Sequence, residues 1–93
     1  MVTEVRASHI LVKTQQECED LLARIKNGED FAHLAKKHSQ CPSGSRGGDL
    51  GFFQRGSMVK EFDDAAFGME KNQVSEPVKT QFGYHLIKVT DTK

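Results

Sequence analysis

Two β-rich segments, one near each end of the chain, are the feature that most constrains how this sequence can fold. Residues 5–12 alternate with a period of two, which puts His9 on a face with three apolar side chains. Residues 84–89 alternate in the same way and put His85 on a face with two. These apolar neighbours are Val5, Ala7 and Leu11 in the first segment and Ile87 and Val89 in the second. The opposite faces carry Ile10, Val12 and Leu86. We expect the two strands to pair and to bring both histidines together.

Two amphipathic helices are predicted after the first strand. Thr14 and Glu17 form a capping-box pattern, in which the Thr14 side chain accepts a hydrogen bond from a backbone N–H. Apolar side chains then recur at helical spacing, and Asn27-Gly28 supplies a stop. Asp30 is predicted to cap a second helix that ends near Ser39. The two buried stripes are Cys18, Leu21, Leu22 and Ile25, and Phe31, Leu34, Ala35 and His38.

Residues 41–56 hold five of the chain's eight glycines, so backbone shape matters in this segment. Within it, residues 49–53 are apolar enough for a brief strand. Ser57 is predicted to cap a short helix that ends at Gly68. A further short strand follows over residues 77–79, where the proline confines it to a sheet edge or a strand start. The resulting order predicts one α+β domain over residues 1–93, with helices packed around a small, mostly antiparallel sheet.

The amino-acid composition limits the classes of partner that we expect. Lys plus Arg and Asp plus Glu are balanced at 13 each, so we expect no nucleic-acid partner. No apolar run approaches the roughly 18 residues of a membrane helix, so we expect no membrane association. Residues 1–6 lack the pattern of a secretion signal, which favours a cytoplasmic location. Cys18 and Cys41 are then expected to be free thiols in a reducing compartment.

Several side chains are candidates for chemistry. His9 and His85 either form a functional polar network or are core histidines satisfied by neighbouring groups. Cys41, beside the glycine-rich segment, is either a nucleophile with a histidine base or a structural cysteine. The histidines and cysteines lack the spacing of a zinc site, so no metal is expected. The glycines at 44–48 lack the lysine of a phosphate-binding loop, and that segment is predicted to be a turn.

A group of apolar side chains near the glycine-containing segments allows two interpretations. The group consists of Leu50, Met58, Phe62 and Phe82. These side chains are either ordinary core or the walls of a shallow apolar pocket. Met adapts its shape and Phe supplies a rigid wall, so such a pocket would suit a five-membered aliphatic ring.

Four stretches together resemble the parvulin-type peptidyl-prolyl cis–trans isomerases, in particular their minimal single-domain bacterial-type members. The stretches are ASHILV at 7–12, CPSGSRGGDLGFF at 41–53, GSMVKEF at 56–62 and TQFGYHLIKV at 80–89. The resemblance implies a βαααβαββ fold, which adds a short helix near residues 42–46. It also implies the site residues. Leu50, Met58 and Phe62 resemble the pocket for the substrate proline ring, with Phe82 as an extra wall. The family also has a polar network beneath the peptide bond that rotates. The residues that resemble this network are His9, Cys41, Thr80 and His85.

The implied activity is acceleration of rotation about X–Pro bonds in proline-containing peptides and in unfolded or partly folded proteins, which assists folding. Neither cofactor nor metal is required. Many relatives carry Asp at the position of Cys41, so we favour non-covalent catalysis over nucleophilic attack. Only Lys13 separates the first strand from the Thr14 cap, so the basic loop of the phosphate-dependent subgroup is missing. We therefore expect no phosphate dependence and a preference for uncharged or hydrophobic residues before proline. The alternative is a non-catalytic binding module or holdase, and in either case we expect a monomer.

Overall fold

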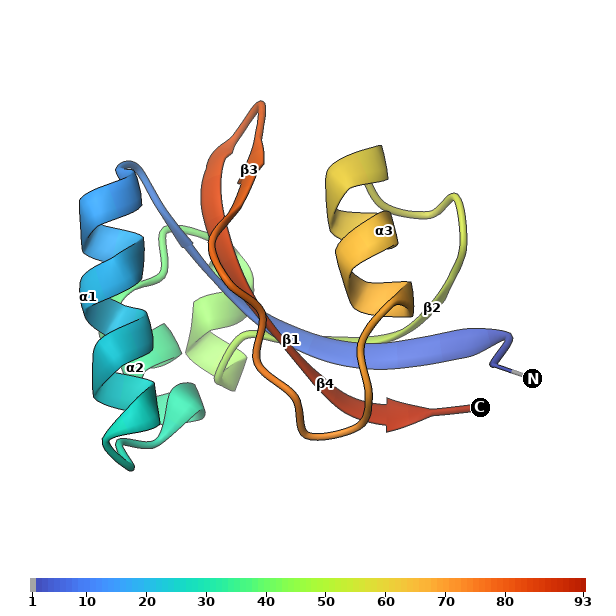
Figure 1. Cartoon of the computed structure of the whole chain (residues 1–93), viewed down its shortest axis with the longest axis horizontal. Coiled ribbons are helices and arrows are strands. Elements are labelled where there is room, and N and C mark those ends of the chain that lie inside the picture. Colours follow the sequence, from blue (N-terminus) through green and yellow to red (C-terminus); the bar gives the residue numbers. More distant parts are fainter. Residues whose placement is uncertain (1) are drawn as a thin grey trace.

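The computed structural model describes residues 2–93 and has the element order expected from the sequence (Figure 1). Four strands, three α-helices and one short 3-10 helix, η1, follow one another as βαααβαββ. In chain order they are β1 (Glu4–Val12), α1 (Gln15–Lys26), α2 (Phe31–His38), η1 (Pro42–Arg46), β2 (Asp49–Gln54), α3 (Lys60–Phe67), β3 (Val78–Thr80) and β4 (Gly83–Thr92). The α+β class is confirmed, and the short helix near residues 42–46 is present.

The strands form one sheet in the order β2-β1-β4-β3, and all neighbours are antiparallel. The first and last strands therefore lie side by side at its centre, as predicted. In their register His9 is opposite Ile87 and His85 is opposite Leu11. The two histidines are diagonal neighbours on one face, within reach of each other's rings. β3 is an edge strand, as expected from Pro77 at its start.

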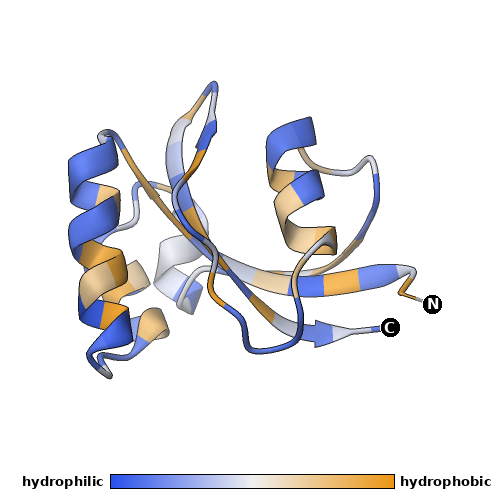
Figure 2. Cartoon of the chain, in the orientation of Figure 1, coloured by the Kyte–Doolittle hydropathy of each residue, from blue (hydrophilic) through white to orange (hydrophobic). Residues whose placement is uncertain are grey.

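Helices cover both faces of the sheet, and the period-two pattern of β1 and β4 divides the core between them. Helices α1 and α2 pack on the face of Ile10, Val12 and Leu86. Helix α3 packs on the opposite face. The apolar side chains on that face include Val5, Ala7, Ile87 and Val89. Figure 2 shows the matching alternation of hydrophilic and hydrophobic residues along α1 and α3. The histidine face is therefore the one that α3 covers.

Side-chain caps start two of the helices at the predicted residues. Thr14 accepts from the Glu17 N–H at 3.1 Å, and Asp30 accepts from the His33 N–H at 3.1 Å. The predicted Ser57 cap is wrong. Helix α3 begins at Lys60 after Val59, which makes no side-chain cap. Residues 55–59 instead form a separate connection from β2.

The glycine-rich segment lies against β1 because it lacks side chains where the backbones meet. Gly48 accepts a hydrogen bond from the His9 N–H at 3.0 Å and has φ +86°. A Cβ at this position would lie 2.3 Å from the His9 carbonyl oxygen. Glycine is therefore needed here both for the left-handed backbone and for the close approach. This contact fixes the start of β2 beside His9.

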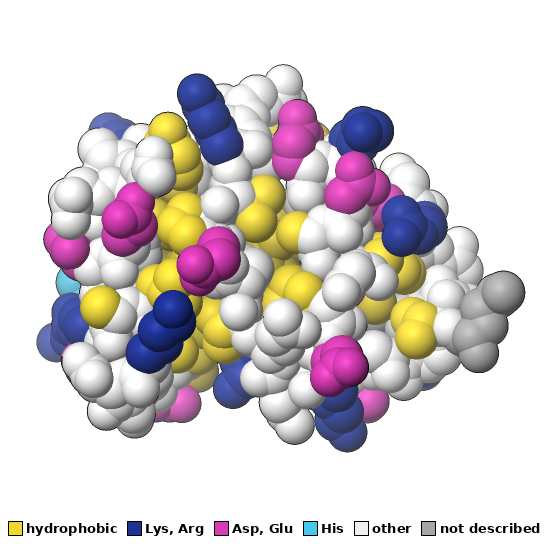
Figure 3. Space-filling model, viewed as in Figure 1, with side chains coloured by type: hydrophobic (Ala, Val, Ile, Leu, Met, Phe, Trp, Pro, Cys, Tyr) yellow, Lys and Arg dark blue, Asp and Glu magenta, His cyan; other side chains and the backbone are white. Residues whose placement is uncertain are grey.

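Charged residues of both signs are scattered over the face shown in Figure 3, around hydrophobic side chains that lie between α1 and α3. Both cysteines are free thiols: Cys18 is buried in the core and Cys41 is half-buried. Within residues 2–93, no helix is long and apolar enough to cross a membrane.

Candidate active site

The two histidines meet at the centre of the sheet. The Nδ1 atoms of His9 and His85 lie 3.0 Å apart and share a hydrogen bond. Their rings are nearly parallel, with centroids 5.2 Å apart. Both side chains are buried. Because two Nδ1 atoms share one hydrogen bond, one must donate a proton and the other must accept it.

Thr80 extends this network on the far side of His85. Its Oγ1 lies 2.8 Å from His85 Nε2 and also accepts a hydrogen bond from the Phe82 N–H at 3.2 Å. The hydroxyl has a second lone pair as well as its proton, so it can either accept from His85 Nε2 or donate to it. In a neutral His85 ring, Nδ1 then has the opposite role toward His9 from the role that Nε2 has toward Thr80. The chain of hydrogen bonds then holds both rings as neutral, complementary tautomers.

Burial keeps both imidazoles neutral. Desolvation and, as the smaller cause, the neighbouring His85 together lower the pKa of His9 to about 4. Burial also lowers the pKa of His85. His9 Nε2 is buried and has no hydrogen-bond partner among the described residues. The pair is therefore uncharged at neutral pH and a weak base.

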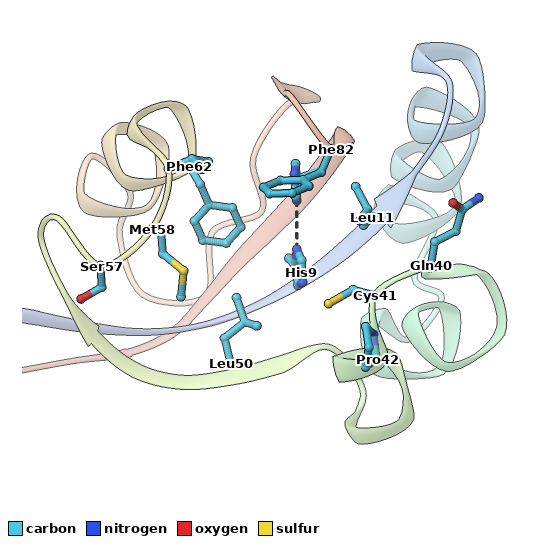
Figure 4. Close-up of a pocket in the computed structure, with 12 residues that line it drawn as sticks. His9, Leu11, Gln40, Cys41, Pro42, Leu50, Ser57, Met58, Phe62 and Phe82 are labelled. Carbon is cyan, nitrogen blue, oxygen red and sulfur yellow. Dashed lines mark hydrogen bonds between the residues drawn. The ribbon is translucent and has the colours of Figure 1, made fainter.

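An apolar cleft of about 490 Å³ opens beside this pair (Figure 4). Phe62 packs edge-on against both rings, with centroids 5.5 Å from each. Leu50 from β2 and Met58 from the connection before α3 lie on the same side of His9 as Phe62. Phe62 is buried and the other two are half-buried, so the walls are packed but open to solvent. The structure thus brings together the three predicted walls, which the pocket interpretation requires.

The other side of the cleft comes from the end of β1, the segment before η1 and the β3–β4 turn. Phe82 lies at this rim with 61% of its surface exposed. The Cys41 sulfur points toward His9 (Figure 4). It accepts a hydrogen bond from the Ser43 hydroxyl, however, at 3.2 Å. Within residues 2–93, no hydrogen bond joins Cys41 to either imidazole. Cys41 therefore lies beside the histidine network rather than in it.

Seven of the eight predicted site residues line one cleft, and Thr80 lies buried behind His85. Their individual roles remain predictions. Five further residues line the cleft but were not predicted as site residues. They are Leu11, Gln40, Pro42, Ser57 and Val59. Leu11 had a usable signal, because the period-two pattern puts it on the face of His9. No group of metal-ligating side chains gathers in the part of the chain that the structure describes.

The family model for the rotamase PPIC-type PPIase domain matches residues 7–91. The chain belongs to this family, the parvulin-type peptidyl-prolyl isomerases. Single-domain parvulins share the whole fold. The solution structure of NmPin from Nitrosopumilus maritimus superposes with a TM-score of 0.88 and 43% identity, covering 98% of this chain and 99% of that one. The resemblance found in the sequence and the isomerase class of this domain are thereby confirmed.

Longer relatives also contain the parvulin domain. The foldase protein PrsA of Geobacillus sp. (strain WCH70) is 57% identical over 89 residues, which are 95% of this chain and 32% of that protein. The crystal structure of PrsA from Bacillus anthracis superposes with a TM-score of 0.97 and 42% identity, covering 99% of this chain and 43% of that one. The chain thus spans about a third of the length of the curated relatives it matches.

The buried His9 makes a testable prediction about stability. The unfolded chain takes up a proton near pH 6.5, whereas folded His9 does so only near pH 4, so the unfolded state binds more protons between these values. The stability due to neutral His9 is complete above about pH 6.5 and falls as the pH drops toward 4. We expect His9 to contribute a loss of about 2 kcal/mol in unfolding free energy between pH 7 and pH 5.

Urea denaturation of the protein and of His9→Leu at both pH values measures this contribution as the difference between their losses. The exposed His33 provides the matched control, because His33→Leu should keep the pH dependence of the unaltered protein. An equal loss in His9→Leu and in the unaltered protein would contradict a depressed His9 pKa.

Proposed function

We propose that the cleft grips the pyrrolidine ring of proline-containing peptides and stabilises the preceding amide in its twisted form. The convergence of Leu50, Met58 and Phe62 beside a neutral imidazole pair is the observation that carries this proposal. An apolar ring fits an apolar wall, and an uncharged floor does not favour one planar isomer through a fixed charge. Substrate binding and rotation would then take place in the same cleft.

Rotation needs no bond to break. The amide barrier is roughly 18–20 kcal/mol, because the planar forms are stabilised by resonance. A thousandfold acceleration requires about 4 kcal/mol of preferential stabilisation of the twisted form. Packing around the ring and exclusion of water from the carbonyl can supply a stabilisation free energy of this order. The proposed reaction thus uses binding energy alone.

We also propose that catalysis is non-covalent. A nucleophilic thiol needs a nearby base or cation to form the thiolate. The neutral His9 is a weak base with a pKa of about 4, and the hydrogen bond at the Cys41 sulfur comes from Ser43. Neither arrangement activates the thiol. Cys41 is better assigned to the wall of the cleft, where its size and polarity tune the floor.

The substrate preference follows from the charge of the lining. The cleft is lined without Lys, Arg, Asp or Glu among the residues that the structure describes. Leu11 lies on the far side of His9 from Met58, and Phe82 lies over the histidine pair. These two apolar side chains border the place where the residue before proline would lie. A charged or phosphorylated residue there would lose hydration without gaining an ionic partner. We therefore propose a preference for uncharged, hydrophobic residues before proline.

Protein folding is the proposed setting of this activity. Relatives that contain this domain are named foldase proteins, and an extended unfolded chain presents X–Pro bonds to an open cleft. Unfolded and partly folded proteins are thus the proposed partners. The monomeric state and the cytoplasmic location expected from the sequence remain predictions. A holdase that binds the same segments without accelerating rotation is the alternative to be tested.

Truncation of the Met58 side chain should weaken catalysis without unfolding the domain. Met58→Ala removes contact area from the proline side of the cleft, and we expect kcat/KM for a tetrapeptide with one X–Pro bond to fall about tenfold. Exchange NMR with catalytic amounts of protein measures the rate directly. Met69→Ala is the matched control, because Met69 is half-buried in the same core cluster but does not line the cleft.

An unaltered protein that adds no exchange cross-peaks while its resonances shift with peptide would establish the holdase alternative. Equal losses in the Met58 and Met69 variants would show that general destabilisation, rather than the cleft wall, limits the rate.

Substitution of Cys41 separates the two chemical mechanisms. A carboxylate is a much weaker nucleophile toward an amide carbonyl than a thiolate, but it can occupy the same polar position in the wall. We therefore expect Cys41→Asp and Cys41→Ser to keep most of the activity, within about tenfold of the unaltered protein. A loss of all measurable acceleration in both variants, with folding intact by circular dichroism, would favour attack by the thiolate.

A further inference from the structure

We propose that Asp63 is a positioning residue for the proline site, acting through the connection that carries Met58. This inference rests on the proposed function, because it assigns Met58 to the substrate-binding wall. Asp63 is the buried ionisable residue of α3, and the mechanism described above does not use it. Its side chain makes one short hydrogen bond to residues that lead into the cleft.

Asp63 is only 6% exposed, which is unusual for a carboxylate. Its Oδ2 accepts a hydrogen bond from the Gly56 N–H at 2.6 Å. Its Oδ1 is buried without a partner among the described residues. A buried oxygen without a partner costs stability, so the carboxylate is a poor choice for stability alone. The short hydrogen bond to Gly56 is the interaction that a carboxylate provides at this position.

Gly56 lies in the connection of residues 55–59 between β2 and α3, where residues 55–57 are exposed. The connection leaves the sheet through a turn, in which the Ser57 N–H donates to the Gln54 carbonyl at 3.2 Å. The Asp63 bond then ties the same turn to α3. Met58 lies two residues after Gly56, so its place in the cleft depends on where the turn is held.

The hydrogen bond between Asp63 and Gly56 also sets the spacing between two walls of the cleft. Asp63 adjoins Phe62 in the sequence, and Phe62 packs against both imidazoles. A bond from Asp63 to Gly56 therefore relates the Met58 segment to the Phe62 ring through a few covalent links. Hydrogen bonds to an ionised acceptor are stronger than neutral ones, so a carboxylate holds the turn more firmly than an amide would.

The test compares binding with turnover in Asp63→Asn, which keeps the shape of the side chain and removes its charge. We expect KM for the tetrapeptide to rise about threefold, because the amide oxygen still accepts from the Gly56 N–H but the bond loses its charge assistance. The value of kcat should stay within about twofold, because the histidine pair is unchanged. The amide proton of Gly56 should move upfield and exchange faster with solvent. Asp63→Ala should raise KM at least as much, while leaving the urea midpoint unchanged or higher.

Asp64→Asn is the matched control. Asp64 is exposed on the same helix and pairs with Arg55 of the same connection and with Lys60, at 3.7 and 3.4 Å. These ion pairs lie in solvent and contribute little, so Asp64 tests a weak link between the same two segments. Its loss should leave KM unchanged within error. A KM unchanged in both Asp63 variants, or a fall in kcat at constant KM, would overturn the proposal. Failure of the unaltered protein to accelerate exchange would instead refute the proposed function, so the two failures are distinguishable.

Discussion

The hydrogen bond between His9 and His85 is the interaction on which the rest of the site depends. It joins the first and last strands at 3.0 Å and requires an Nδ1 proton on one ring and an Nδ1 lone pair on the other. Antiparallel pairing of β1 and β4 sets the register that makes the two residues diagonal neighbours. Phe62 then packs against both rings, and Thr80 fixes the outer nitrogen of His85. A floor assembled from opposite ends of the chain is complete only when the whole sheet has formed.

The sheet divides the tasks of stability and function between its faces. Helices α1 and α2 seal one face over an aliphatic core. On the other face α3 covers the end of the sheet near the termini and leaves the histidine region as an open cleft. Half-buried side chains such as Leu50 and Met58 belong to both the core and the cleft. This sharing explains how a chain of 93 residues can hold a packed core and a binding surface at the same time.

Local patterns predicted the parts of the structure that local forces decide. Alternation in residues 5–12 and 84–89 predicted the central strands and the meeting of His9 with His85, and polar side chains predicted the starts of α1 and α2. The start of α3 was missed because no side chain caps it. The cleft walls lie on separate elements, so their pattern alone allowed either ordinary core or a pocket, and the resemblance to parvulins was needed to favour the pocket. The Asp63 bond to Gly56 had no signal at all, since spacing does not reveal which carboxylate becomes buried.

Nitrogen-15 NMR of the imidazole rings at pH 7 tests the central claim most directly, because chemical shifts and couplings report which ring nitrogens carry protons. Two neutral rings with a single Nδ1 proton between them are predicted, so that one ring is protonated at Nδ1 and the other at Nε2. Two rings both protonated at Nε2 alone would contradict the account, because they have no Nδ1 proton to share. A charged imidazolium in either ring at pH 7 would also contradict it, because burial lowers the pKa of both histidines.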